Sequence, residues 1–116
     1  MKVTIFSDII FYNIKRMETM RIKAKLKDGI VIVKMMAKHI MLSQAEAKRQ
    51  GKTANYITNM LGTVGDTIVF EAATSQTLSR DPYVKFYFNG AKKGDTLKMS
   101  WKDLLGNEKV DTAKIK

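Results

Sequence analysis

The chain has 116 residues, 21 of them basic and 11 acidic, for a net charge of +10 at pH 7. With no cysteine and one histidine, the sequence excludes disulfides and thiolate chemistry and argues against a multi-histidine metal site, so we predict no enzyme activity and no cofactor. The length allows one domain with one core, and no apolar run is long enough to span a bilayer.

The positive charge is the strongest compositional signal. It indicates either an anionic partner, such as an acidic protein, a nucleic acid or a small anion, or a solvated lysine-rich surface. The basic residues are dispersed along the chain and form no dense arginine run. That dispersion favours an acidic protein over a nucleic acid.

Residues 1–19 differ from the rest of the chain because their apolar residues are spaced for one face of a short helix. Asp8 and Asn13 interrupt the apolar stretch and no small-residue cleavage site follows, so we expect no signal peptide here. The favoured interpretation is an extension that results from an upstream start codon. The alternative is an amphipathic helix that docks on a partner or a membrane surface.

Residues 20–116 have the patterning of β-strands. Polar and apolar residues alternate up to Lys27, Asp28-Gly29 suits a hairpin turn, and the next strand has apolar residues on both faces, which predicts a central strand. Residues 42–54 predict a mobile loop with room for one helical turn. Further strands are expected at residues 55–61, 66–73, 83–88, 95–102 and 108–115, separated by turns at 62–65, 75–82, 89–94 and 104–107. Seven short strands predict an all-β, immunoglobulin-like antiparallel sandwich.

The expected strand at 83–88 has two different faces. Its core face is predicted to carry Val84, Phe86 and Phe88. Its outer face is predicted to carry Tyr83, Lys85 and Tyr87. Tyrosines beside a lysine predict a partner interface, since tyrosine offers a large contact area at small entropic cost. The alternative is that these tyrosines only cover cross-strand neighbours.

Four other residues carry specific expectations. The only proline, Pro82, predicts either the start of an edge strand or the corner before it, and an extended conformation for Asp81. Trp101 is expected in the core. His39 and Met41 end the central strand on one face, and an imidazole with a thioether could ligate copper. Two ligands without a third instead favour a hydrogen-bonded histidine near a partner surface, so we include both residues in the candidate interface.

Four collinear segments are similar to one family. They are Lys25-Leu26-Lys27-Asp28-Gly29, Ala37-Lys38-His39-Ile40-Met41, Asp81-Pro82-Tyr83, and Gly90-Ala91-Lys92-Lys93-Gly94-Asp95 leading to Ser100-Trp101. Together they resemble the SoxZ subunit of the SoxYZ carrier of bacterial thiosulfate oxidation, over residues 20–116. The chain departs from the usual family pattern at Ile40, where proline is common.

The resemblance implies a non-catalytic subunit. SoxZ-like chains pair with a SoxY-like subunit whose cysteine carries sulfur intermediates, and they meet other sulfur-oxidation enzymes transiently. The family resemblance also implies a periplasmic location reached together with the signal-bearing partner, and no nucleic-acid partner. The alternative function is that of a basic β-sandwich module that binds nucleic acid or acidic proteins.

Overall fold

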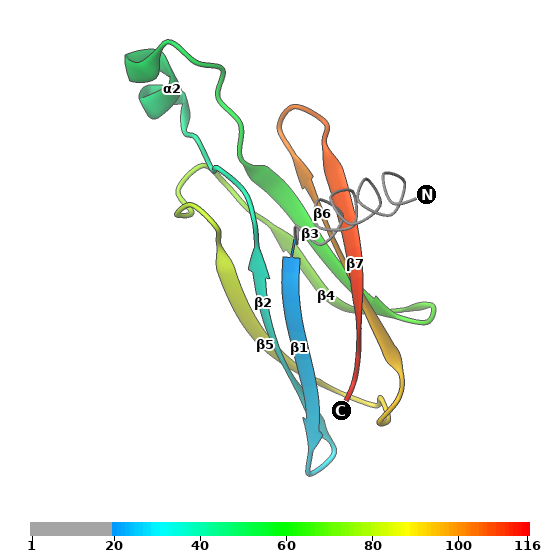
Figure 1. The fold of residues 1–116 in the computed structure, drawn as a ribbon. Helices are drawn as coiled ribbons and strands as arrows, with labels where there is room; N and C mark the ends of the chain where they lie inside the picture. Colours follow the sequence, from blue (N-terminus) through cyan, green and yellow to red (C-terminus); the bar gives the residue numbers. More distant parts are fainter. Residues whose placement is uncertain (1–19) are drawn as a thin grey trace, which may run out of the picture.

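The computed structural model describes residues 20–116, so the expectations for residues 1–19 lie outside the described residues. The described part is a sandwich of two antiparallel sheets, as predicted (Figure 1). One sheet has the strand order β1-β2-β5 and the other the order β4-β3-β6-β7. The strands are β1 (Met20–Lys27), β2 (Ile30–Ala37), β3 (Ile57–Val64), β4 (Thr67–Ala73), β5 (Tyr83–Asn89), β6 (Thr96–Asp103) and β7 (Glu108–Lys114).

Strand β2 is the central strand of the three-stranded sheet, as expected. It pairs with β1 from Lys27↔Ile30 to Met20↔Ala37, and its other edge pairs with β5. The two-residue turn between β1 and β2 has positive φ at Asp28 (53°) and Gly29 (79°), the conformation that this turn requires. The hairpin therefore sets which residues of β1 and β2 face the core.

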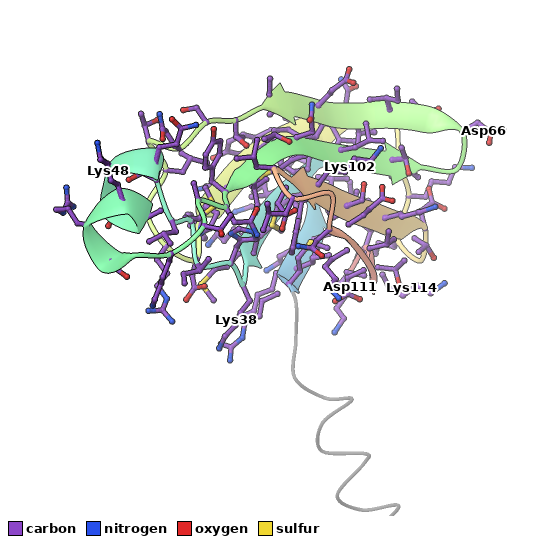
Figure 2. The ribbon with its side chains drawn as sticks, turned by 90° about the horizontal axis from the view of Figure 1, so that it is seen from above. Lys38, Lys48, Asp66, Lys102, Asp111 and Lys114 are labelled. Carbon is purple, nitrogen blue, oxygen red and sulfur yellow. The ribbon has the colours of Figure 1, made fainter. Side chains whose placement is uncertain are left out.

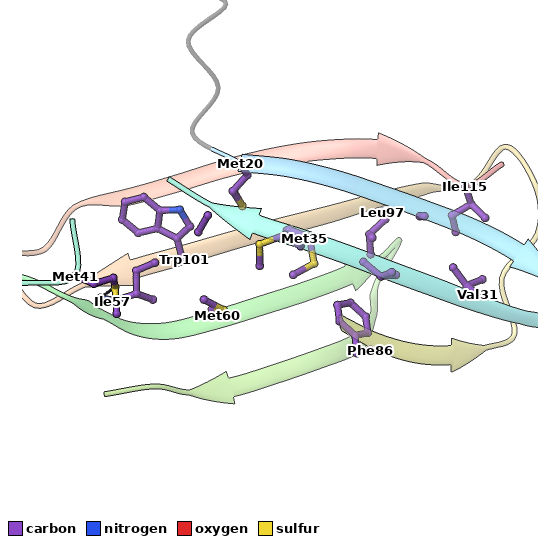
Figure 3. Close-up of a cluster of buried hydrophobic side chains, with 14 residues drawn as sticks. Met20, Val31, Met35, Met41, Ile57, Met60, Phe86, Leu97, Trp101 and Ile115 are labelled. Carbon is purple, nitrogen blue, oxygen red and sulfur yellow. Dashed lines mark hydrogen bonds between the residues drawn. The ribbon is translucent and has the colours of Figure 1, made fainter. Parts of the chain in front are cut away.

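The core lies between the two sheets (Figure 3). Met35 of β2 and Leu97 and Met99 of β6 are fully buried, and Trp101 is buried as predicted. Phe86 of β5 stacks on Phe70 of β4 with ring centroids 4.3 Å apart. Val84 and Phe88 pack against this core, which confirms the core face predicted for β5.

The end of β3 differs from the expectation. We predicted a turn at residues 62–65, but β3 continues to Val64 and the turn falls at Gly65 and Asp66. Gly62 lies inside the strand, where an added Cβ would come 2.7 Å from Sδ of Met99 and 3.3 Å from Cβ of Phe70. The glycine thus serves close packing within the sheet instead of a turn.

Residues 42–54 contain more regular structure than the expected loop. Helix α2 (Gln44–Gln50) begins with a capping box between Ser43 and Glu46 and ends at Gly51 in the left-handed conformation. Figure 2 shows Lys48 of this helix at one end of the molecule and Asp66 at the other. Within residues 20–116, no helix is long and apolar enough to cross a membrane.

Candidate partner-binding surface

The outer face of the three-stranded sheet contains the predicted interface strand. The strand register places three rows across it: Arg21–Met36–Tyr83, Lys23–Lys34–Lys85 and Lys25–Ile32–Tyr87. We use the name outer face for these nine residues. No other layer of the described structure covers the outer face, because the core lies on the opposite side of the sheet.

The tyrosines of β5 are among the most exposed large side chains of the described residues. Tyr83 is 60% and Tyr87 59% exposed, and Lys85 lies between them with its Nζ 5.6 Å from the Tyr87 ring centroid. Tyr87 is directly opposite Ile32, so aromatic and aliphatic surface adjoin on this face. The structure therefore brings together the three outward residues predicted from the sequence.

The charge on this sheet has one sign. Strands β1, β2 and β5 contain six basic residues and no acidic residue. Lys23 lies opposite Lys34, and Lys34 lies opposite Lys85. Like charges directly opposite each other repel, so this row favours a negatively charged neighbour.

His39 and Met41 are placed differently from the tyrosines, because both are buried, at 8% and 4% exposure. Nδ1 of His39 accepts a hydrogen bond from the Met41 backbone N–H at 3.0 Å, so the ring proton is on Nε2. Nε2 donates to Oδ2 of Asp103 at 3.0 Å. The imidazole also meets Trp101 edge-on, with centroids 5.0 Å apart. The expected hydrogen-bonded histidine is present, but β2 ends at Ala37, so His39 and Met41 lie beyond the strand that they were expected to end. The contact of His39 with a partner stays a prediction.

Asp103, at the end of β6, is the centre of this buried network. Its Oδ2 accepts hydrogen bonds from His39 Nε2, Asn55 Nδ2 and Asn107 Nδ2, and its Oδ1 accepts one from the Asn107 backbone N–H. Burial raises the pKa of the Asp103 carboxyl, but the hydrogen bonds from His39, Asn55 and Asn107 outweigh burial and lower the pKa from 3.8 to about 2. Asp103 therefore stays ionised and joins the end of β2 to the β6–β7 turn.

The donor atoms of His39 and Met41 that could ligate copper are occupied in this arrangement. Both ring nitrogens of His39 form hydrogen bonds, and Sδ of Met41 accepts one from the Ile57 backbone N–H at 3.3 Å. Among residues 20–116, no group of three His, Cys, Asp or Glu side chains could hold a metal ion. The pair thus serves to connect the sandwich at this end.

Asp81 differs from its expected extended conformation, because its φ is +52°. Its backbone N–H donates to the His39 carbonyl at 2.9 Å, and its Oδ1 accepts from the His39 backbone N–H at 2.9 Å. This two-way contact holds the left-handed conformation that proline alone disfavours. Pro82 itself stands directly before the edge strand β5, as predicted.

Sequence reasoning missed Asp103, Asn55 and Asn107 as members of one network. Asp103 begins the turn that contains Gly106 and Asn107, and aspartate at the start of a turn is a recognisable signal. That signal predicts the bond to Asn107. The contacts with His39 and Asn55 join residues 64 and 48 positions apart, which no local pattern indicates.

Comparisons with known proteins extend this description. No curated protein matches the chain. Among solved structures, hypothetical protein PH1083 from Pyrococcus horikoshii OT3 aligns with a TM-score of 0.62 and 13% identity, over 85% of this chain and 88% of that one. A variant of the superoxide reductase (neelaredoxin) from Archaeoglobus fulgidus, in the reduced form, aligns with a TM-score of 0.53 and 14% identity, over 82% and 83%. At such identities the likeness concerns the fold alone.

The sequence model of one family matches nearly all of the described residues. It is described as sulphur oxidation protein SoxZ, and the match spans residues 20–114. The matched range begins where the strand pattern begins and includes all seven strands. The chain therefore belongs to the SoxZ family of sulphur oxidation proteins.

Proposed function

We propose that this chain is the non-catalytic subunit of a heterodimeric sulfur carrier, in which it supports a SoxY-like subunit. The observation that carries the proposal is the SoxZ family match across residues 20–114. The chain contains no cysteine, so a covalently held sulfur cargo must reside on the partner. In this role the chain works in the periplasm and is exported together with the partner.

The outer face is the surface we assign to this partner. Tyrosine, methionine and arginine are enriched in protein interfaces, and the outer face combines Tyr83, Tyr87, Met36 and Arg21. The large exposed area of the two tyrosines supports the same assignment. The lysine row between them supplies charge that selects an acidic counterpart.

The buried His39–Asp103 pair supports a structural role over a catalytic one. It resembles the histidine and carboxylate of a hydrolase, but the second ring nitrogen accepts a backbone hydrogen bond and has no free lone pair for a substrate proton. Both side chains are also buried. Transient contacts with the other sulfur-oxidation enzymes then involve the assembled carrier, not chemistry on this chain.

Co-expression with a SoxY-like subunit tests the proposal. We expect the two chains to co-elute from a size-exclusion column and to give a saturable one-to-one isotherm in titration calorimetry. Absence of both co-elution and heat would refute the subunit role. Tight, sequence-selective binding of a nucleic acid at ~0.15 M salt would instead favour a basic nucleic-acid-binding module.

A further inference from the structure

A groove runs from the middle of the outer face across the edge of β1 to the last residues of the chain. Figure 1 shows that the C-terminal end lies beside β1. Ala24 forms a parallel bridge with Ile115, the Leu26 backbone N–H donates to the Lys116 carbonyl at 2.7 Å, and the Lys116 N–H donates to the Ala24 carbonyl at 3.0 Å. These contacts fix one wall of a groove of about 800 Å³. Its position is therefore set by backbone hydrogen bonds.

Lysines from four segments surround this groove. They are Lys23, Lys25, Lys34, Lys85, Lys114 and Lys116. Among the described residues that line it, none is acidic. Because Lys23, Lys34 and Lys85 lie directly opposite one another in neighbouring strands, a bound anionic group would lower their mutual repulsion.

Between the lysines the lining is aliphatic. Ile32 of β2 lies on the same face as Lys23, Lys25, Lys34 and Lys85, and Ile22 and Ala24 of β1 and Ala113 of β7 add apolar lining from the core side. An occupant that uses both parts must carry negative charges and small apolar groups in alternation. A volume of about 800 Å³ lies near the upper end of the range for ligand pockets, so a single small oxyanion leaves most of the groove unfilled.

The lining also argues against a nucleic acid. It contains no aromatic side chain on which a base could stack and no arginine. An extended polypeptide in which acidic and aliphatic residues alternate meets both requirements, since its carboxylates can reach the lysines while its aliphatic side chains lie on Ile32. Charge complementarity therefore selects one kind of occupant.

We propose that this groove binds an extended, acidic segment of a partner protein, in which carboxylates alternate with small aliphatic side chains. The inference rests on the charge and shape of the groove and does not depend on the sulfur-carrier role. If the carrier role also holds, the segment belongs to the partner subunit or to an enzyme that visits the carrier. Either source uses the same lysines.

Fluorescence anisotropy with a labelled synthetic peptide of alternating Glu and Val tests the groove. We expect saturable binding to the full chain, and binding about tenfold weaker to the double variant Lys23→Gln/Lys34→Gln. The matched control Lys48→Gln/Lys98→Gln removes the same charge from α2 and from the other sheet, and should bind nearly as well as the unaltered chain. Equal weakening in both variants, or no saturable binding, would overturn the proposal.

Two further probes separate the ligand classes. A peptide of alternating Gln and Val should not bind, and an all-Glu peptide should bind more weakly than the Glu-Val peptide because it leaves the aliphatic surface uncovered. If an oligonucleotide or sulfate displaces the labelled Glu-Val peptide completely at a lower concentration than the unlabelled Glu-Val peptide does, that result would overturn the assignment to a polypeptide. If the lysine variants do not fold, amide NMR shifts of the unaltered chain must still concentrate at β1, β2 and residues 113–116.

Discussion

The outward surfaces of the two sheets differ in charge. Strands β1, β2 and β5 carry six basic and no acidic residues, whereas β3, β4, β6 and β7 carry four basic and four acidic residues, of which only Asp103 is buried. On the four-stranded sheet Lys102 pairs with Glu108 at 3.9 Å, so part of its charge is matched internally. A surface that neutralises its own charge needs no partner, and the three-stranded sheet lacks that property. The three-stranded sheet is therefore the candidate for binding an anionic partner.

The two sheets are joined by apolar packing and by a buried polar network. Their inner faces share one core, and at one end the network of His39 and Asp103 connects the end of β2 to the end of β6. The strands that carry the outer face are therefore held to the four-stranded sheet by both apolar packing and buried polar contacts. The first two predictions test this connection.

The largest effect is expected from Asp103→Ala. The substitution leaves the buried His39 Nε2–H without its acceptor and also removes the acceptor of the half-buried Asn55 and the exposed Asn107, so we expect a loss of about 3 kcal/mol in the free energy of unfolding. Urea denaturation measures it. The control Glu108→Ala, which breaks only the exposed pair with Lys102, should cost less than about 0.5 kcal/mol. Equal losses would show that the network does not join the sheets.

The pH dependence of stability comes next. Because the pKa of Asp103 falls from 3.8 to about 2 on folding, the folded state binds fewer protons, and this stabilisation is complete above about pH 4 and lost as the pH falls towards 2. It amounts to about 2 kcal/mol. The free energy of unfolding should fall by about 2 kcal/mol less between pH 4 and pH 2 in Asp103→Asn than in the unaltered chain. Asp66→Asn, in the exposed β3–β4 turn, should leave this fall unchanged. Unchanged pH dependence in Asp103→Asn would contradict the network.

Tyr87→Ala tests which of the two sheets binds the partner. We expect binding of the SoxY-like subunit to weaken by about 1.5 kcal/mol, roughly tenfold in Kd, because Tyr87 offers a large exposed ring beside Ile32 and Lys85. Titration calorimetry measures the change. Val110→Ala removes an exposed apolar side chain from the four-stranded sheet and should leave Kd within about twofold. A larger effect of Val110→Ala would move the interface to the other sheet.

Deletion of residues 1–19 should have the smallest effect. The matched family range and the strand pattern both begin at Met20, so the three-stranded sheet should form without the upstream segment. We expect thermal unfolding to shift by less than about 5 °C, or about 1 kcal/mol. A larger drop would show that the three-stranded sheet depends on these residues.

The parts of the fold that follow from local rules could be predicted from the sequence. Alternation of apolar residues assigned the inner and outer faces of β5, and Asp28-Gly29 indicated the first hairpin. The family resemblance rested on the same collinear segments. The turn predicted at Gly62 was wrong because the sequence does not distinguish a glycine that permits a turn from one that permits the close approach of Met99.

The capping residues of α2, Ser43, Glu46 and Gly51, could be recognised in the sequence, and they would have predicted the full helix instead of a loop with one helical turn. The burial of His39 and Met41 could not be predicted in the same way. It depends on Asp103 and Asp81, which approach from distant parts of the chain. Candidate site residues on regular strands were therefore predictable in orientation, and those at strand ends were not.

Lysine acetylation, followed by mass spectrometry of the free chain and of its complex with a SoxY-like subunit, tests whether the outer face is the surface that binds the partner. We expect Lys23, Lys34 and Lys85 on the outer face to lose most of their reactivity in the complex. Lys98 and Lys102 of the four-stranded sheet should keep theirs. Protection of Lys98 and Lys102, with the outer-face lysines as reactive as in the free chain, would contradict this assignment.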